Sequence, residues 1–153
     1  MASTSDLAGA LAAIEARLAA NWTTTRIAYV NIEPNDPWPP VNESGGLVAW
    51  IYVEVDGDGA EIHAFGTPLN QTVIDTGDIR ITVFVPKGEG LDQARAHAVA
   101  LGEIFRQQLF YNSDPTAYVR SGTPRIDGGI AVSDDGNWVT MTTTVPFEFY
   151  HRA

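Results

Sequence analysis

The chain has 153 residues, 44% of them hydrophobic, a formal net charge of −10 and no cysteine. This length and apolar content favour one globular domain, residues 1–153, with a core of its own. The absence of cysteine excludes disulfides, thiolate metal sites and thiol nucleophiles.

The N-terminal third predicts a helix, a strand and a long loop. Apolar residues recur at helical spacing from Leu7 to Leu18 in an alanine-rich background. Residues 26–32 have the composition of a strand, and residues 33–46 include four prolines that exclude regular structure. Trp38 in this loop either packs back onto the domain or waits for a partner, and the length of the loop favours neither alternative.

The centre of the chain predicts strands followed by the strongest helical pattern. Residues 47–55 are β-branched and aromatic, stop at the Asp-Gly-Asp-Gly sequence of residues 56–59 and resume at residue 60, which predicts a hairpin. Residues 79–85 alternate apolar and polar side chains, as in a strand with one buried face. Apolar residues then follow a helical period over residues 91–109.

The last third predicts strands at residues 116–120, 125–133 and 138–151. Pro146 cannot donate a ladder hydrogen bond, so it marks an edge or a bulge at which the strand changes partners. With hairpins on both sides of a central helix, the element order indicates an α+β fold. We expect a mostly antiparallel β-sheet with two α-helices packed on one face.

The negative charge is concentrated in one segment. Between Ile27 and Ile79 there is no Lys or Arg, and there are nine acidic residues: Glu33, Asp36, Glu43, Glu54, Asp56, Asp58, Glu61, Asp75 and Asp78. Neutralising phosphate requires Lys and Arg, so this surface disfavours tight nucleic-acid binding. No stretch approaches the roughly 18 apolar residues of a membrane span, so we expect no membrane partner.

The glycine-rich turn of residues 86–90 lies between a strand and a helix, where nucleotide-binding proteins hold phosphate. A Walker loop places its Lys after the glycines, whereas Lys87 precedes them, and a dinucleotide fingerprint has a third glycine where this chain has Gln93. Glu89 would also place a carboxylate among the phosphates. We interpret the turn as a structural strand-to-helix reversal.

Metal and catalytic patterns are weak. The carboxylates of the Asp-Gly-Asp-Gly segment resemble a Ca²⁺ loop, but strands rather than helices flank them. The three histidines, His63, His97 and His151, have no spacing typical of a shared metal. We therefore predict no catalytic, cofactor or metal site. The alternative of a small divalent-metal enzyme or ligand-binding domain would use Asp56, Asp58, Glu61 and His63.

Four segments together resemble the small tail-terminator and tail-completion proteins of long-tailed bacteriophages. They are LAAIEARLAANW at residues 11–22, RIAYVNIEP at 26–34, IRITVFVPKGEGLDQARAHAVALGEIF at 79–105, and GNWVTMTTTVPFEFY at 136–150. The resemblance is one of pattern and length over nearly the whole chain, and it includes no catalytic signature.

The resemblance implies a structural virion protein rather than an enzyme, made in the host cytoplasm and located in the tail or neck. Such proteins form homo-oligomeric rings, commonly hexamers, that end polymerisation of the tail-tube protein and join the tail to a neck or head-closure protein. DNA passes through the ring without specific binding. A tail-tube or head-closure role in the same apparatus is the alternative, and tube proteins differ by polymerising.

A ring requires contacts between different surfaces of neighbouring copies, and loops and strand edges commonly supply them. As contact residues we predict Trp38, Pro39, Lys87, Glu89, Phe147 and Phe149. As acidic residues lining the channel we predict Glu54, Asp56, Asp58 and Glu61, because like charge would let DNA slide.

Overall fold

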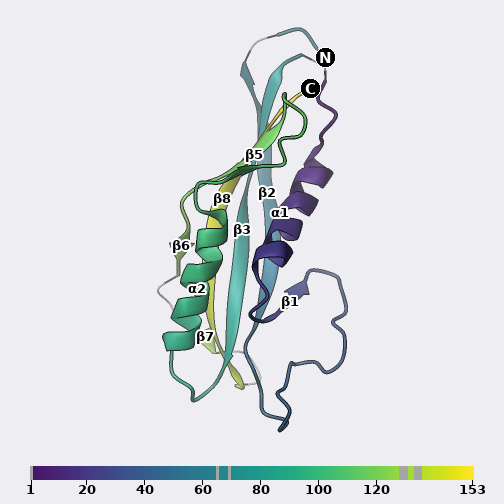
Figure 1. Ribbon diagram of the computed structural model, residues 1–153. Coiled ribbons are helices and arrows are strands. Elements are labelled where there is room, and N and C mark those ends of the chain that lie inside the picture. The colour runs from purple at the N-terminus through teal and green to yellow at the C-terminus, as the bar shows by residue number, and fades with distance from the viewer. Residues whose placement is uncertain (1, 65, 69, 128–130, 133–135) are drawn as a thin grey trace.

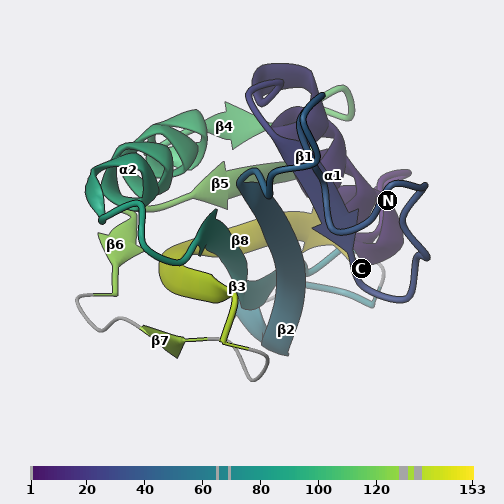
Figure 2. The same cartoon turned by 90° about the horizontal axis from the view of Figure 1, so that it is seen from below.

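The computed structural model describes residues 2–64, 66–68, 70–127, 131–132 and 136–153. It is an α+β fold in which a curled, mostly antiparallel sheet has both helices on one face (Figures 1 and 2), as predicted. In chain order the elements are α1 (Leu7–Asn21), β1 (Arg26–Tyr29), β2 (Trp50–Ala64), β3 (Thr72–Pro86), α2 (Asp92–Phe105), β4 (Leu109–Phe110), β5 (Tyr118–Ser121), β6 (Arg125–Ile126), β7 (Ala131–Val132) and β8 (Trp138–Arg152). Within the described residues, neither helix has the length and apolar composition of a membrane span.

Three strands of 15 residues each, β2, β3 and β8, form the centre of the sheet. The strand order is β1-β2-β3-β8-β5-β4, and β6 and β7 also pair with β8. β1 runs parallel to β2, whereas the other pairs are antiparallel. Residues that are paired across antiparallel strands point to the same face, so this register assigns each side chain of the three long strands to one face.

The predicted turn at residues 56–59 is wrong, because β2 continues through it. The strand takes up the Asp-Gly-Asp-Gly segment as a register shift between Gly57 and Gly59, and it then pairs with β3 as far as Ala64. Glycines that permit a turn also permit a bulge, and Gly59 has a φ of +150°. Residues 72–78 were missed as strand because Asp and Gly have low β-propensity.

Pro146 lies where β8 changes neighbours, which confirms the prediction made from its missing N–H. β6 pairs with β8 at Thr144, and β5 pairs with β8 from Phe147 onward. Between these two ladders the N–H of Gly122 donates to the carbonyl oxygen of Pro146 at 2.8 Å. The edge of β8 that lacks an N–H at Pro146 is therefore the edge on which the paired strand changes from β6 to β5.

The hydrophobic core lies between the helices and the face of the sheet formed by odd-numbered residues of β3 and β8. Ile14 and Leu18 of α1 and Leu101 and Phe105 of α2 are completely buried there. Phe147 and Phe149, predicted as contact residues, are 2% and 0% exposed and belong to this core. The prediction is wrong for them because β8 keeps its alternation through Pro146, so both rings face the helices.

Asp114 ties the segment before α1 to the loop before β5. One of its carboxylate oxygens accepts from the Thr116 N–H at 2.8 Å, and the other accepts from the Thr4 N–H at 2.6 Å. Ser3 adds a hydrogen bond from its N–H to the carbonyl oxygen of Arg152 at 2.9 Å. The hydrogen bonds that Thr116 and Thr4 donate favour the ionised carboxylate of Asp114, and together, led by that from the Thr116 N–H, they hold the pKa of Asp114 well below its usual range.

Asp114→Asn is expected to destabilise the fold at pH 7 and to matter less in acid. A carboxyl whose pKa is lowered by folding stabilises the protein above its unfolded pKa of about 3.9, and this contribution is lost as the pH falls below that value. The difference in urea midpoint between the natural chain and the variant should therefore shrink below about pH 4. A difference that is the same at pH 7 and in acid would contradict the assigned role.

Candidate assembly surface

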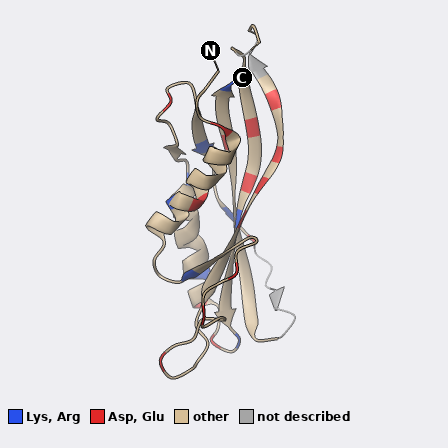
Figure 3. Cartoon of the chain, turned by 90° about the vertical axis from the view of Figure 1, so that its right-hand side faces the viewer, with Lys and Arg blue, Asp and Glu red and all other residues tan. Residues whose placement is uncertain are grey.

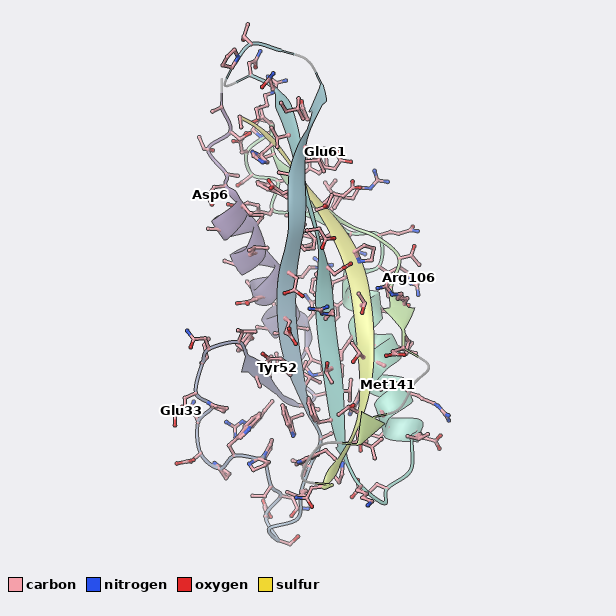
Figure 4. All side chains as sticks on the ribbon, turned by 180° about the vertical axis from the view of Figure 1, so that it is seen from behind. Asp6, Glu33, Tyr52, Glu61, Arg106 and Met141 are labelled. Carbon is pink, nitrogen blue, oxygen red and sulfur yellow. The ribbon has the colours of Figure 1, made fainter. Side chains whose placement is uncertain are left out.

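The face of the sheet that points away from the helices is rich in carboxylates. Cross-strand pairing sets Glu54 opposite Arg80, Asp56 opposite Asp78 and Glu61 opposite Ile74 on this face. Glu148 joins them from β8, opposite Thr76. Figure 3 shows the acidic bands along the β2–β3 hairpin, and Figure 4 views this face with Tyr52 and Glu61 labelled. We call this side of the sheet, which points away from the helices, the open face.

The structure places three of the four predicted channel residues, Glu54, Asp56 and Glu61, on the open face. Asp58 lies in the register shift and has no residue opposite it on β3. Arg80 forms an ion pair with Asp56 and approaches Glu54 to 3.7 Å. The ion pairs of the described residues do not include Asp58 or Glu61, and both of these side chains are exposed.

Aromatic rings cover the end of the open face where β2 begins. Trp50 stacks on Phe84 at a centroid distance of 3.9 Å, and Trp138 meets Trp50 edge-on at 5.9 Å. Trp38 contacts Trp50 edge-on at 4.8 Å. The structure thus decides between the two alternatives for Trp38, which packs back onto the domain, while its neighbour Pro39 stays exposed.

Arg26 holds the proline-rich loop in this position. Its guanidinium donates to the carbonyl oxygens of Asn35 at 2.6 Å and Pro37 at 2.5 Å, and it lies over the Trp38 ring at 4.9 Å. Sequence reasoning missed this role, because the donor and the two carbonyls are separated by 9 and 11 residues. The loop is therefore anchored within one chain.

Arg26→Ala is expected to release the loop without unfolding the domain. Val48 reports on the loop, because its N–H donates to the carbonyl oxygen of Pro40 at 3.2 Å. Loss of the two charge-assisted hydrogen bonds of Arg26, each worth about 1.5 kcal/mol, should speed hydrogen exchange of the Val48 amide by about tenfold or more. Arg95→Ala, on the exposed surface of α2, is the matched control and should leave exchange in the loop unchanged. Equal exchange in both variants would show that the aromatic contacts alone hold the loop.

The turn at residues 86–90 is a strand-to-helix reversal, as interpreted from the sequence. Gly88 and Gly90 have φ values of +93° and +78°, which side chains disfavour, and α2 begins two residues later at Asp92. The Lys87 N–H donates to the carbonyl oxygen of Asn137 at 2.9 Å, which ties the turn to the start of β8. Lys87 and Glu89 are exposed and thus accessible to a neighbour, although their predicted contacts stay a prediction.

Among the described residues, those of the divalent-ion alternative form no ligand set. Asp56 is engaged by Arg80, and no three His, Asp or Glu side chains among the described residues are grouped to hold a metal. The side chain of His63 lies outside the described part of the chain. His97 meets Trp22 edge-on, and burial lowers the pKa of its imidazole. His151 is 2.7 Å from Asp75.

A second polar feature, which sequence reasoning missed, lies where β5 meets β8. A cavity of about 410 Å³ is lined there by Arg120, Ser121, Gly122, Pro146, Phe147, Glu148 and Tyr150. The Tyr150 hydroxyl donates to Glu148 at 2.5 Å, and this bond is the main cause that raises the pKa of Tyr150 to about 12. Glu148 is therefore held by Tyr150, although Arg120 is its cross-strand neighbour. Among the described residues, neither Arg120 nor Arg125 forms an ion pair.

The β2 strand has a long free edge. β1 pairs only with residues from Trp50 to Val53 of β2, and β3 occupies the other side of the strand. From Glu54 to Ala64, β2 therefore has no strand beside it within the described residues. Such an edge presents backbone N–H and C=O groups that can pair with another chain.

No model of a known protein family matches the chain, and no curated protein matches it. Twelve chains in solved structures match. One of them superposes with a TM-score of 0.58 at 18% sequence identity, over 92% of this chain and 92% of its own. The name of that protein carries no functional description, and at this identity the likeness concerns the fold alone.

Proposed function

We propose that this chain is a structural protein that assembles into a ring, in the manner of the phage tail terminators that its sequence resembles. The observation that carries the proposal is the two-sided sheet: helices cover one face, whereas the open face is acidic and ends at the free edge of β2. A closed ring requires two different, complementary surfaces on each copy. The two edges of this sheet differ from each other, so they provide two different surfaces.

In this ring the open face lines the channel. Glu54 and Asp56 then present carboxylates to DNA, with Asp58 and Glu61 toward the β2 margin. Because DNA carries about one negative charge per 1.7 Å of its axis, these carboxylates repel it and reduce adhesion during passage. The ring ends the tail tube on one side and meets the neck or head-closure protein on the other.

The size of the purified protein tests the proposal. We expect rings of uniform diameter in negative-stain micrographs and a single species of about six copies by light scattering, following the ring size implied by the resemblance. Added tail-tube protein should form tubes that stop growing at the rings. A protein that stays monomeric at every concentration would overturn the proposal.

Two other outcomes would change the assignment within the same apparatus. Open-ended tubes formed by this chain alone would indicate a tail-tube protein. Rings that bind a neck protein but leave tube growth unchanged would indicate a head-closure protein. An increase in melting temperature with Ca²⁺, Mg²⁺, Mn²⁺ or Zn²⁺ would instead favour the divalent-ion domain, because a ligand of the native state stabilises it by mass action.

A further inference from the structure

Toward its two lateral margins the sheet has exposed charges of opposite sign that form no ion pair among the described residues. At the β2 margin, Asp58 and Glu61 are exposed and have no ion pair among the described residues. Toward the opposite margin, Arg120 of β5, which β4 flanks on its outer side at Leu109, and Arg125 of β6 are also exposed and lack one. In Figure 2, β3 and β8 lie between β2 and β6. The charges are therefore arranged head to tail across one chain.

The charges of opposite sign also lie at the same height, which here means the same position along the direction of the strands. Cross-strand pairing connects the margins through two rows of residues. One row is Gly59, Thr76, Glu148 and Arg120, and it ends at Leu109 of the edge strand β4. The other row is Glu54, Arg80, Thr144 and Arg125. Asp58 and Glu61 flank the β2 end of the first row, so they lie at the height of Arg120.

Matching heights are what a closed ring demands. Copies in a ring are related by rotation alone, without translation along the axis, so contacting surfaces must lie at one height. With the long strands of Figure 1 running along the axis, the β2 margin of one copy meets the margin of the next that β4 and β6 form, with Arg120 one strand inside it. Asp58 and Glu61 then face Arg120 at the first row, whereas Glu54 of the second row already lies 3.7 Å from Arg80 of its own chain.

We propose that the β2 margin of one copy docks against the Arg120 and Arg125 margin of the next, with Asp58 and Glu61 paired to Arg120. The partner is a second copy of this chain, and the inference rests on the proposed ring. Charges on a strand edge also oppose pairing with arbitrary edges, so the carboxylates select an arginine-bearing neighbour. The contact thus combines attraction with discrimination.

Charge reversal tests this contact. The variant Asp58→Lys with Glu61→Lys, and separately Arg120→Glu with Arg125→Glu, should each raise the protein concentration needed for ring formation by about tenfold or more, because like charges then meet. All four substitutions in one chain should restore rings, since lysines then face glutamates. Equimolar mixing of the two double variants should also restore rings. When the two variants alternate around the ring, opposite charges meet at every contact.

A matched pair of reversals away from both margins, Glu43→Lys with Arg95→Glu, keeps the net charge and should leave assembly unchanged. Circular dichroism and urea midpoints of each variant confirm that the exposed substitutions leave the fold intact. If the natural chain forms rings and either double variant forms them equally well, the contact is overturned while the ring proposal stands. If single-margin reversal blocks assembly but the fourfold variant does not recover it, the pairing is also overturned. A natural chain that is always monomeric overturns both proposals.

Discussion

Gly77→Ala is expected to lower the free energy of unfolding by about 3 kcal/mol, at the upper end of the cost of overpacking a core. A methyl group at residue 77 would lie 2.0 Å from the carbonyl oxygen of Asp56 and 2.8 Å from the ring of Phe147. The first neighbour is backbone and cannot rotate away, so relief requires β2 to separate from β3. The change should appear as a lower urea midpoint followed by tryptophan fluorescence.

The residue directly opposite, Gly57, is the matched control. A methyl group there would have no atom within 4 Å. Gly57→Ala is therefore expected to leave stability unchanged or to raise it by up to about 1 kcal/mol, because alanine restricts the unfolded chain. Equal midpoints for the two variants would show that the β2–β3 hairpin adjusts easily at this crossing. The rows that place Asp58 level with Arg120 would then be adjustable too.

Phe149→Ala is expected to lower the free energy of unfolding by about 3–5 kcal/mol, the cost of removing a buried ring and leaving a cavity. The Phe149 ring is completely buried and tilts against Tyr111 at a centroid distance of 6.0 Å. Ile62→Ala on β2 provides the comparison. Ile62 is 61% exposed, so its truncation should change stability by no more than about 0.5 kcal/mol.

Protein concentration separates the core role of Phe149 from a role in subunit contact. A core residue of one chain destabilises the monomer, so the loss should be the same at every protein concentration below assembly. A contact residue would instead change stability in a concentration-dependent way, because assembly stabilises the native state by mass action. A loss confined to assembling concentrations would reinstate Phe149 as a contact.

Local chemistry was enough to predict several features of this chain. The alternation of residues 79–85 placed one face of β3 in the core, and helical spacing located α1 and α2. The prediction is wrong at the end of the second helix, because α2 stops at Phe105, Gln107 has a φ of +48° and Leu109 belongs to β4. The missing N–H of Pro146 marked the change of partner along β8, and the order of Lys and Gly in residues 86–90 indicated a reversal. Each of these depends on one residue type or on one period within a single element.

Other features depend on residues that meet only in the folded chain. Whether residues 56–59 turn or bulge depends on the pairing energy with residues 72–78, far along the sequence. The position of Trp38 depends on Trp50 and Arg26, and the burial of Phe149 on the helices across from it. The acidic segment was visible in the sequence. That Asp58 and Glu61 share a height with Arg120 is decided by cross-strand register, because register sums contacts over three long strands and no single segment contains it.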